Sequence, residues 1–181
     1  GVREAGAGYQ PVAGASAKPK YASTQLDVPA NLADEILAVG RTLPKTALAE
    51  DGVEDTPHVT VQFGLHDHTP GAVRSALAGT GPVPVTLGAV MRFTADPKQD
   101  VLIVQADSPE LRRLREAVRG SGEVTDTHPE YRPHVTIAYV KKGAAPELDG
   151  DTRFAGRTFT ADTLTFAPPG EQANTSIPLV P

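Results

Sequence analysis

A pentapeptide that begins with Pro-His occurs twice in this chain of 181 residues. It reads Pro-His-Val-Thr-Val at residues 57–61 and Pro-His-Val-Thr-Ile at residues 133–137. Successive side chains of an extended strand point to opposite faces, so the His and the Thr of each copy share one face. The aliphatic residues of each copy form the other face, which can pack on a core. Because packing gives no reason for an imidazole at both positions, the repeat predicts one shared site built from two strands.

The residue types of the repeat suit proton transfer at a phosphate. Imidazoles titrate near neutral pH, so one can accept a proton while the other donates one. Hydroxyl groups can donate hydrogen bonds to phosphate oxygens. We therefore predict His58 and His134 as catalytic residues and Thr60 and Thr136 as substrate-binding residues. The sequence leaves open which histidine is the base and which is the acid.

The doubled His-x-Thr motif resembles that of the two-histidine (2H) phosphoesterase superfamily. This superfamily includes cyclic phosphodiesterases, RNA-ligase-like proteins and phage enzymes that degrade the cyclic-oligonucleotide signals of bacterial CBASS immunity. The spacing of 134 − 58 = 76 residues leaves room for the strands and helix that separate the two motifs in that family. Residues 51–65 and 128–140 look most like the phage and actinobacterial domains related to the anti-CBASS phosphodiesterases.

The resemblance implies an α+β fold with pseudo-two-fold symmetry, in which two antiparallel-sheet lobes carry helices outside and enclose a central cleft. It also implies a phosphodiesterase that needs no metal or other cofactor. The expected substrate is a small cyclic nucleotide or cyclic oligonucleotide, with phage evasion of CBASS immunity as the specific version. Two alternatives remain: hydrolysis of 2′,3′-cyclic phosphate ends on nucleotides or RNA, and a module that binds a cyclic nucleotide without turnover.

Charge and composition restrict the partners. A net charge of −5 and a pI near 5.5 argue against a protein that grips long nucleic acid, which needs a broad basic surface. Only local donors are needed for a small phosphorylated ligand, and Arg132 beside the second motif is a substrate-binding candidate. Lys141 and Lys142 follow the second motif strand, and we interpret both as solvated surface charges. Tyr131 and Tyr21 are candidates for stacking on a base, or else fill the edge of the core.

The sequence shows neither a secretory leader nor a run of the roughly 18 apolar residues that a membrane helix needs. We expect no membrane partner and a cytoplasmic location, in the host cell if the protein is phage-encoded. With no cysteine in the sequence, disulfides, thiolate nucleophiles and Cys-ligated zinc are excluded. The cluster His66-Asp67-His68 offers a rival metal site. It lies in a predicted loop, however, and we interpret this cluster and His128 as loop residues.

The pattern of the chain suggests a duplicated unit. Residues 1–19 are rich in Gly, Ala, Ser and Pro and predict a flexible arm, and without an initiator Met we expect the chain to be part of a longer polypeptide. Residues 20–181 are expected to form one domain. Aligning residues 27–29 with residues 107–109 places the histidines 58 − 27 = 31 and 134 − 107 = 27 residues downstream, so the two halves are nearly in phase.

Hydrophobic periodicity and turn residues predict the individual elements. Strands are expected at residues 21–28, 57–65, 83–94, 100–106, 133–140, 157–166 and 174–180. Helices are expected after a cap near Asn31, after Thr69 as a cap with Pro70 at the first position, and from residues 107–109 to Gly120.

Overall fold

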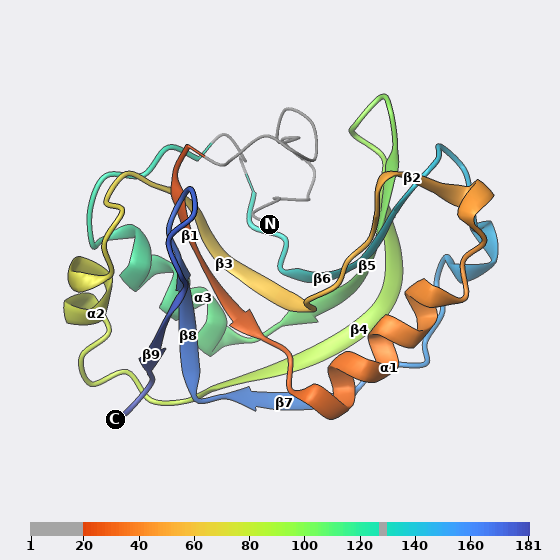
Figure 1. Cartoon of the computed structure of the whole chain (residues 1–181). Helices are drawn as coiled ribbons and strands as arrows, with labels where there is room; N and C mark the ends of the chain where they lie inside the picture. Colours follow the sequence, from red (N-terminus) through yellow and green to blue (C-terminus); the bar gives the residue numbers. More distant parts are fainter. Residues whose placement is uncertain (1–19, 127–129) are drawn as a thin grey trace.

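A computed structural model, drawn in Figure 1, describes residues 20–126 and 130–181. The arm predicted for residues 1–19 and the predicted loop residue His128 lie outside the described residues. Within the described part, the strands form one antiparallel sheet in the order β7-β4-β5-β6-β3-β1-β8-β9, and β2 pairs with β6 off this path. The strands are β1 Ala22–Asp27, β2 Leu48–Val53, β3 His58–Leu65, β4 Val83–Phe93, β5 Asp100–Asp107, β6 His134–Val140, β7 Thr158–Ala161, β8 Thr163–Ala167 and β9 Thr175–Pro178.

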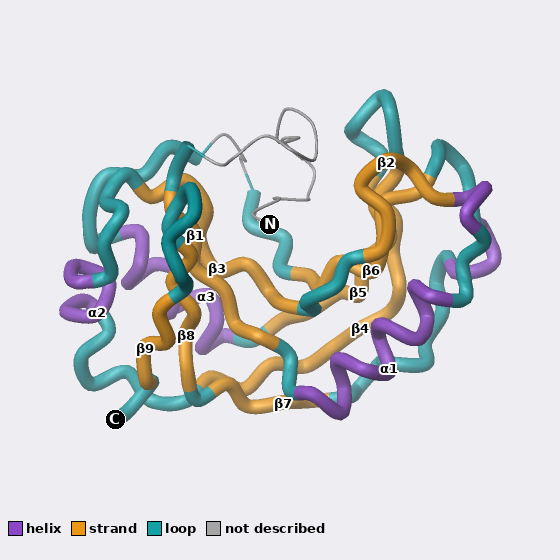
Figure 2. Tube along the Cα trace, viewed as in Figure 1, coloured by secondary structure: helices purple, strands orange, loops and turns teal. Residues whose placement is uncertain are grey.

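The sheet is strongly curled and forms an open half-barrel, visible as the trough of orange strands in Figure 2. The chain itself shows how far the curl goes. Strands β7 and β8 are separated only by Asp162, yet β7 pairs with β4 at one end of the sheet and β8 pairs with β1 near the other. The prediction of a single strand at residues 157–166 was therefore wrong, because the chain leaves one lobe at Asp162 and enters the other.

Two amphipathic helices cover the convex side of the sheet (Figure 1). Helix α1, Ala30–Arg41, buries Ile36 and Val39 and packs against β6 and β2. Helix α3, Pro109–Arg119, buries Leu111, Leu114 and Val118 and packs against β3 and β4. Each helix thus covers the motif strand of the opposite half, as expected for two halves related by a pseudo-two-fold axis.

The helix starts differ in part from the prediction. Ser108 caps α3 as a Ser-Pro start predicts, and its Oγ accepts a 3.1 Å hydrogen bond from the backbone N–H of Leu111. Asn31, in contrast, lies inside the first turn of α1, whose N-cap position is Pro29. Thr69 does not cap α2, Gly71–Ala76, because its backbone N–H and its hydroxyl both donate to the Asp67 carboxylate, and Pro70 takes the cap position. Short 3-10 helices at Lys45–Ala47 and Pro146–Leu148 and strand β2 were not predicted.

The main core lies between the helices and the convex face of the sheet. Val59, Ile137 and Leu114 are buried there, together with residues from every long strand. The apolar positions of both motifs therefore anchor β3 and β6 on the convex side, as the alternation predicts. A smaller apolar cluster of Phe93, Val101, Ile103 and Tyr139 is separate from this core, and Ile103 pairs with Thr136 in the sheet. No helix in the part of the chain that the structure describes is long and apolar enough to cross a membrane.

Candidate active site

The two motif strands meet at the centre of the sheet. β3 and β6 run antiparallel, and Val59 pairs with Val135. This register sets His58 across from Thr136 and Thr60 across from His134, and residues opposite each other in an antiparallel pair point to the same face. The structure thus brings the two predicted histidines and the two predicted threonines together on the concave face. His134 and Thr136 are only 6% and 8% exposed, whereas His58 and Thr60 are half-buried.

Both imidazoles are held in the same way. The Nδ1 atom of His58 lies 2.7 Å from the carbonyl oxygen of Thr56, and Nδ1 of His134 lies 2.7 Å from that of Arg132. A carbonyl can only accept, so each Nδ1 carries the proton and donates it. In a neutral ring this tautomer makes Nε2 the nitrogen that can accept a proton. Each histidine is therefore preset for proton transfer through Nε2.

The prolines before the histidines fasten both motif strands to their neighbours. The carbonyl of Pro57 accepts a 3.1 Å hydrogen bond from the N–H of Val28, and the carbonyl of Pro133 accepts one of the same length from Ala106. Proline also biases the residue before it toward an extended backbone. The carbonyl two residues before each histidine can then turn toward its ring, which explains why Pro precedes His in both copies.

Strand β1, which is the neighbour of β3 in the sheet, supplies a polar cluster beside His58. Asp27 pairs directly with His58 in the sheet, so its side chain is on the same concave face. Its carboxylate accepts hydrogen bonds from the amide of Gln25 at 2.6 Å and from the hydroxyl of Thr165 at 2.7 Å. Sequence reasoning used Asp27 only to align the halves and did not propose these three residues as part of the site.

Beside His134, strands β4 and β5 supply an aromatic ring and an amide in place of a carboxylate cluster. The ring of Phe93 lies edge-on to the His134 ring at a centroid distance of 5.0 Å, and the Arg132 guanidinium lies 4.8 Å above the centre of Phe93. Gln105 pairs with His134 in the sheet. Neither Phe93 nor Gln105 was proposed from the sequence, although Gln105 stands in a Gln-x-Asp-x-Pro segment that repeats the one at residues 25–29.

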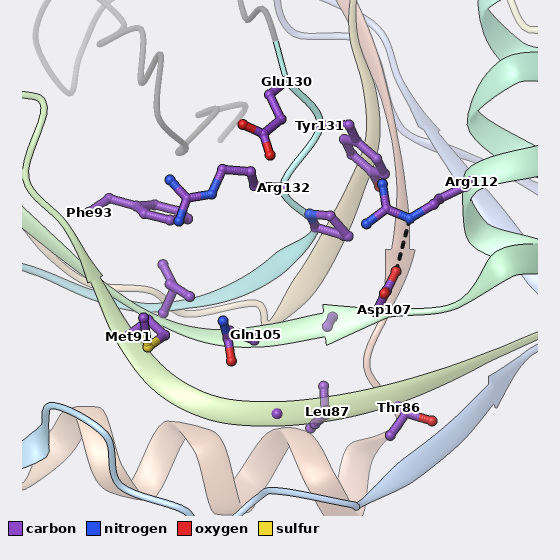
Figure 3. A pocket seen from close by; sticks show the side chains of 14 residues that line it. Thr86, Leu87, Met91, Phe93, Gln105, Asp107, Arg112, Glu130, Tyr131 and Arg132 are labelled. Atoms are coloured by element: carbon purple, nitrogen blue, oxygen red, sulfur yellow. Dashed lines mark hydrogen bonds and ion pairs between the residues drawn. The ribbon is translucent and has the colours of Figure 1, made fainter.

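A cavity of about 430 Å³ opens beside His134, between β4, β5 and the segment that leads into β6 (Figure 3). Figure 3 shows Phe93 and Arg132 on one side of it, Tyr131 and Arg112 on the other, and Gln105 between them. Arg132 therefore lies where the sequence predicted a substrate-binding group, and this role stays a prediction. The cavity is lined by Thr86, Leu87, Gly88, Met91, Phe93, Ile103, Gln105, Ala106, Asp107, Arg112, Glu130, Tyr131, Arg132 and Pro133.

Tyr131 links the two motifs. Its hydroxyl donates a 2.7 Å hydrogen bond to the backbone carbonyl of Thr60, and the guanidinium of Arg115 lies 4.5 Å from its ring centre. The ring also lines the cavity, so stacking on a base stays a prediction for Tyr131. The hydrogen bond gives this residue a second, structural role that the sequence did not indicate.

Tyr21 is not brought to the histidine pair. It precedes β1 at the end where Ala22 pairs with Leu65, whereas Asp27 pairs with His58 at the other end. At 3.3 Å per residue, this separates Tyr21 from the pair by roughly 20 Å along the strand. Its ring stacks on His66 at 4.7 Å instead. A substrate contact at Tyr21 stays a prediction and would need an extended ligand.

Residues 66–68, the rival metal site that we interpreted as a loop, make ordinary loop contacts. Nε2 of His66 lies 2.6 Å from the hydroxyl of Thr125, and the Asp67 carboxylate holds the turn at Thr69. Hydrogen bonds from Thr69 lower the pKa of Asp67 below its usual value. Within residues 20–126 and 130–181, no group of three or more His, Cys, Asp or Glu side chains is placed to hold a metal ion. A metal-independent mechanism stays a prediction.

The two lysines after the second motif differ in their contacts. Lys141 is exposed, but Lys142 forms a 2.7 Å ion pair with the buried carboxylate of Asp100 and also donates to two backbone carbonyls. Burial acts to raise the pKa of Asp100, but hydrogen bonds from Lys142, the N–H of Gly143 and Arg92 outweigh it and hold this pKa below its usual value. Lys142 is therefore part of the fold of this lobe.

The sequence profile of the 2′-5′ RNA ligase superfamily matches residues 54–167, a segment that contains both His-x-Thr motifs. The chain belongs to the 2′-5′ RNA ligase superfamily. Membership confirms the predicted resemblance to the 2H phosphoesterases and the predicted phosphodiesterase class. No curated protein matches the chain.

Solved structures of other proteins share the fold. TT0787 of Thermus thermophilus superposes with a TM-score of 0.59 at 15% identity, covering 87% of this chain and 97% of that one. Escherichia coli LigT complexed with NADP+ gives a TM-score of 0.59 at 15% identity, covering 89% and 95%. Kluyveromyces marxianus Usb1 with uridine monophosphate gives 0.56 at 14% identity, covering 87% and 98%. These similarities confirm the predicted α+β architecture, with its curled antiparallel sheet and outer helices.

Proposed function

We propose that this 2H phosphodiesterase hydrolyses a small cyclic nucleotide or cyclic oligonucleotide, with His58 and His134 as its acid/base pair. The observation that carries the proposal is the β3–β6 register, which sets the two motifs side by side with both rings preset for proton transfer through Nε2. A protein that only bound a nucleotide would need no second proton-transfer group.

In the proposed step, Nε2 of one histidine takes the proton of a water molecule while the water oxygen bonds to phosphorus. The bond from phosphorus to the leaving ester oxygen breaks, and the other histidine gives its Nε2 proton to that oxygen. The hydroxyls of Thr60 and Thr136 donate to the non-bridging phosphate oxygens, where charge increases in the transition state. The products are a phosphate monoester and a free hydroxyl, and the two histidines have exchanged protonation states.

The surroundings of the pair favour a small substrate. The cavity of about 430 Å³ is within the usual size range of small-ligand sites. Several cationic side chains nearby are already paired, since Arg112 binds Asp107 and Arg115 binds Asp126. With a net charge of −5, the chain offers few groups to hold a long phosphate backbone. Degradation of CBASS signals in a host cytoplasm is the specific version that we propose.

A second candidate is hydrolysis of 2′,3′-cyclic phosphate ends on nucleotides or RNA. The superfamily is named after RNA ligase activity, and the similar structures include LigT with 3′-AMP and Usb1 with uridine monophosphate. The same four motif residues would serve this reaction, so substrate identity alone separates the two candidates.

The test is a substrate panel with EDTA present throughout. Cyclic dinucleotides, cyclic trinucleotides and 2′,3′-cyclic mononucleotides are each incubated with the protein, and products are separated by chromatography. We expect ring opening of a cyclic oligonucleotide. Turnover confined to 2′,3′-cyclic mononucleotides would favour the second candidate, and no turnover of any phosphodiester would contradict both.

A further inference from the structure

The two halves of the chain carry the same strand segment next to each motif. Gln-Leu-Asp-Val-Pro at residues 25–29 belongs to β1, which pairs with β3, and Gln-Ala-Asp-Ser-Pro at residues 105–109 belongs to β5, which pairs with β6. Gln25 and Gln105 are thus equivalent by sequence. Gln25 pairs with Thr60 and Gln105 pairs with His134, so both side chains lie on the concave face.

The two glutamine amides differ in what they bind. Gln25 is buried, and its amide nitrogen donates to Asp27 at 2.6 Å. The equivalent carboxylate, Asp107, accepts instead from the Nε of Arg112 at 3.0 Å and from the N–H of Ser108 at 2.9 Å. Gln105 is exposed, and within the described residues its amide has no hydrogen-bond partner. In residues 25–29 the glutamine amide is therefore bound to the aspartate of the same segment, while in residues 105–109 the glutamine amide can bind a ligand.

A glycine on the neighbouring strand leaves room for the Gln105 side chain. Gly88 of β4 lies beneath Gln105, and a Cβ at position 88 would be 3.1 Å from both Cβ and Oε1 of Gln105. Both contacts are tighter than ordinary van der Waals distance, so the Gln105 side chain would have to shift by a few tenths of an ångström. The glycine therefore lets the Gln105 side chain lie across the floor of the cavity, between the Phe93 and Arg132 side and the Tyr131 side (Figure 3).

We propose that this cavity binds a nucleobase of the substrate and that Gln105 is a specificity-determining residue that selects adenine. Flat aromatic and guanidinium groups on its sides suit a planar base. A glutamine amide presents a donor and an acceptor side by side, which matches the N6 amino group and N7 of adenine. Because Gln105 is the sheet neighbour of His134, the base would lie on the His134 side of the scissile phosphate. The inference rests on the proposed function for the position of that phosphate.

The test changes the amide and measures binding. Dissociation constants of adenosine 3′-monophosphate and its 7-deaza analogue are measured by calorimetry for the parent, Gln105→Glu and Gly88→Ala. The analogue keeps the N6 amino group and lacks only the N7 acceptor, and a carboxylate has no N–H to donate to N7. We expect the parent to bind the adenine nucleotide more tightly than the analogue by about fivefold or more, the range of one paired contact, and the glutamate variant to lose that preference. Gly88→Ala should weaken the preference while circular dichroism shows an intact fold.

Gln172→Glu is the matched control, because it makes the same change at an exposed position outside the cavity lining. We expect it to leave the ratio of the two dissociation constants at the parental value. A ratio unchanged in Gln105→Glu, or no binding of either nucleotide to the parent, would overturn the inference. Binding does not require turnover, so the two proposals fail separately. Adenine preference without hydrolysis would contradict only the proposed function, and hydrolysis without base preference would contradict only the role of Gln105.

Discussion

The hydroxyl of Tyr131 donates a 2.7 Å hydrogen bond to the backbone carbonyl of Thr60, and so connects the segment before the second motif to the strand of the first. Tyr131 lies three residues before His134, and Thr60 lies across from His134 in the sheet. The bond therefore fixes the distance between the two halves at the site where both must act on one phosphate.

Tyr131→Phe removes this bond and keeps the ring. We expect the free energy of unfolding to fall by about 1 kcal/mol, the usual value of one neutral hydrogen bond, and kcat/KM to fall severalfold because the two halves are less firmly aligned. Urea unfolding and steady-state kinetics measure the two effects. Thr42→Val is the control, since its hydroxyl makes a 2.6 Å bond to the carbonyl of Val39 far from the site. It should lose similar stability with kcat/KM unchanged, and an equal loss of kcat/KM in both variants would contradict the alignment role.

The motif threonines can be tested without changing shape. Thr60→Val and Thr136→Val each remove one hydroxyl, and we expect each to cost about 1–3 kcal/mol of transition-state binding if that hydroxyl donates to a phosphate oxygen. The measurement is kcat/KM on the best substrate of the panel. Thr160 is exposed on β7, and Thr160→Val should leave kcat/KM as it was. Parental kcat/KM in both motif variants would show that the hydroxyls have no part in catalysis.

The buried carboxylate of Asp100 should support the fold in a pH-dependent way. Its pKa is lowered in the folded state, so its contribution to stability is present above the pKa of an unfolded Asp and is lost as pH falls through the folded value. We expect Asp100→Asn to lower the free energy of unfolding by about 1.5–3 kcal/mol at pH 7, the value of hydrogen bonds to a charged group. Urea unfolding should show this deficit shrinking toward pH 2.

Glu35→Gln provides the comparison for Asp100. Its ion pair with Arg157 also lowers a carboxyl pKa, but both side chains are exposed to solvent. Surface pairs of this kind contribute little. A loss at Glu35 as large as the loss at Asp100 would contradict the importance of the buried network.

Much of the fold and the central site could be predicted because alternation within a strand is a local property. The motif strands and the shared face of the four motif side chains follow from it. The helix opened by Ser108 follows from another local signal, the Ser-Pro start and the helical period of its apolar residues. The break at Asp162 has a local signature that the prediction of one strand did not use. The apolar residues are at positions 159 and 161 in β7 but at 164 and 166 in β8, so the alternation shifts phase across Asp162. The difference between Gln25 and Gln105 could not be predicted, because it depends on Arg112 reaching Asp107 across the start of a helix.

The most direct test of the central claim is kcat/KM as a function of pH, with EDTA present, for the parent, His58→Ala and His134→Ala. If one imidazole must be neutral and the other protonated, the parent should give a bell-shaped profile that EDTA leaves unchanged. Each variant should fold, lose roughly 10²–10⁴-fold in rate, and keep only one limb of the profile. Parental activity in either variant, or activity that EDTA abolishes and added zinc or manganese restores, would contradict the two-histidine mechanism.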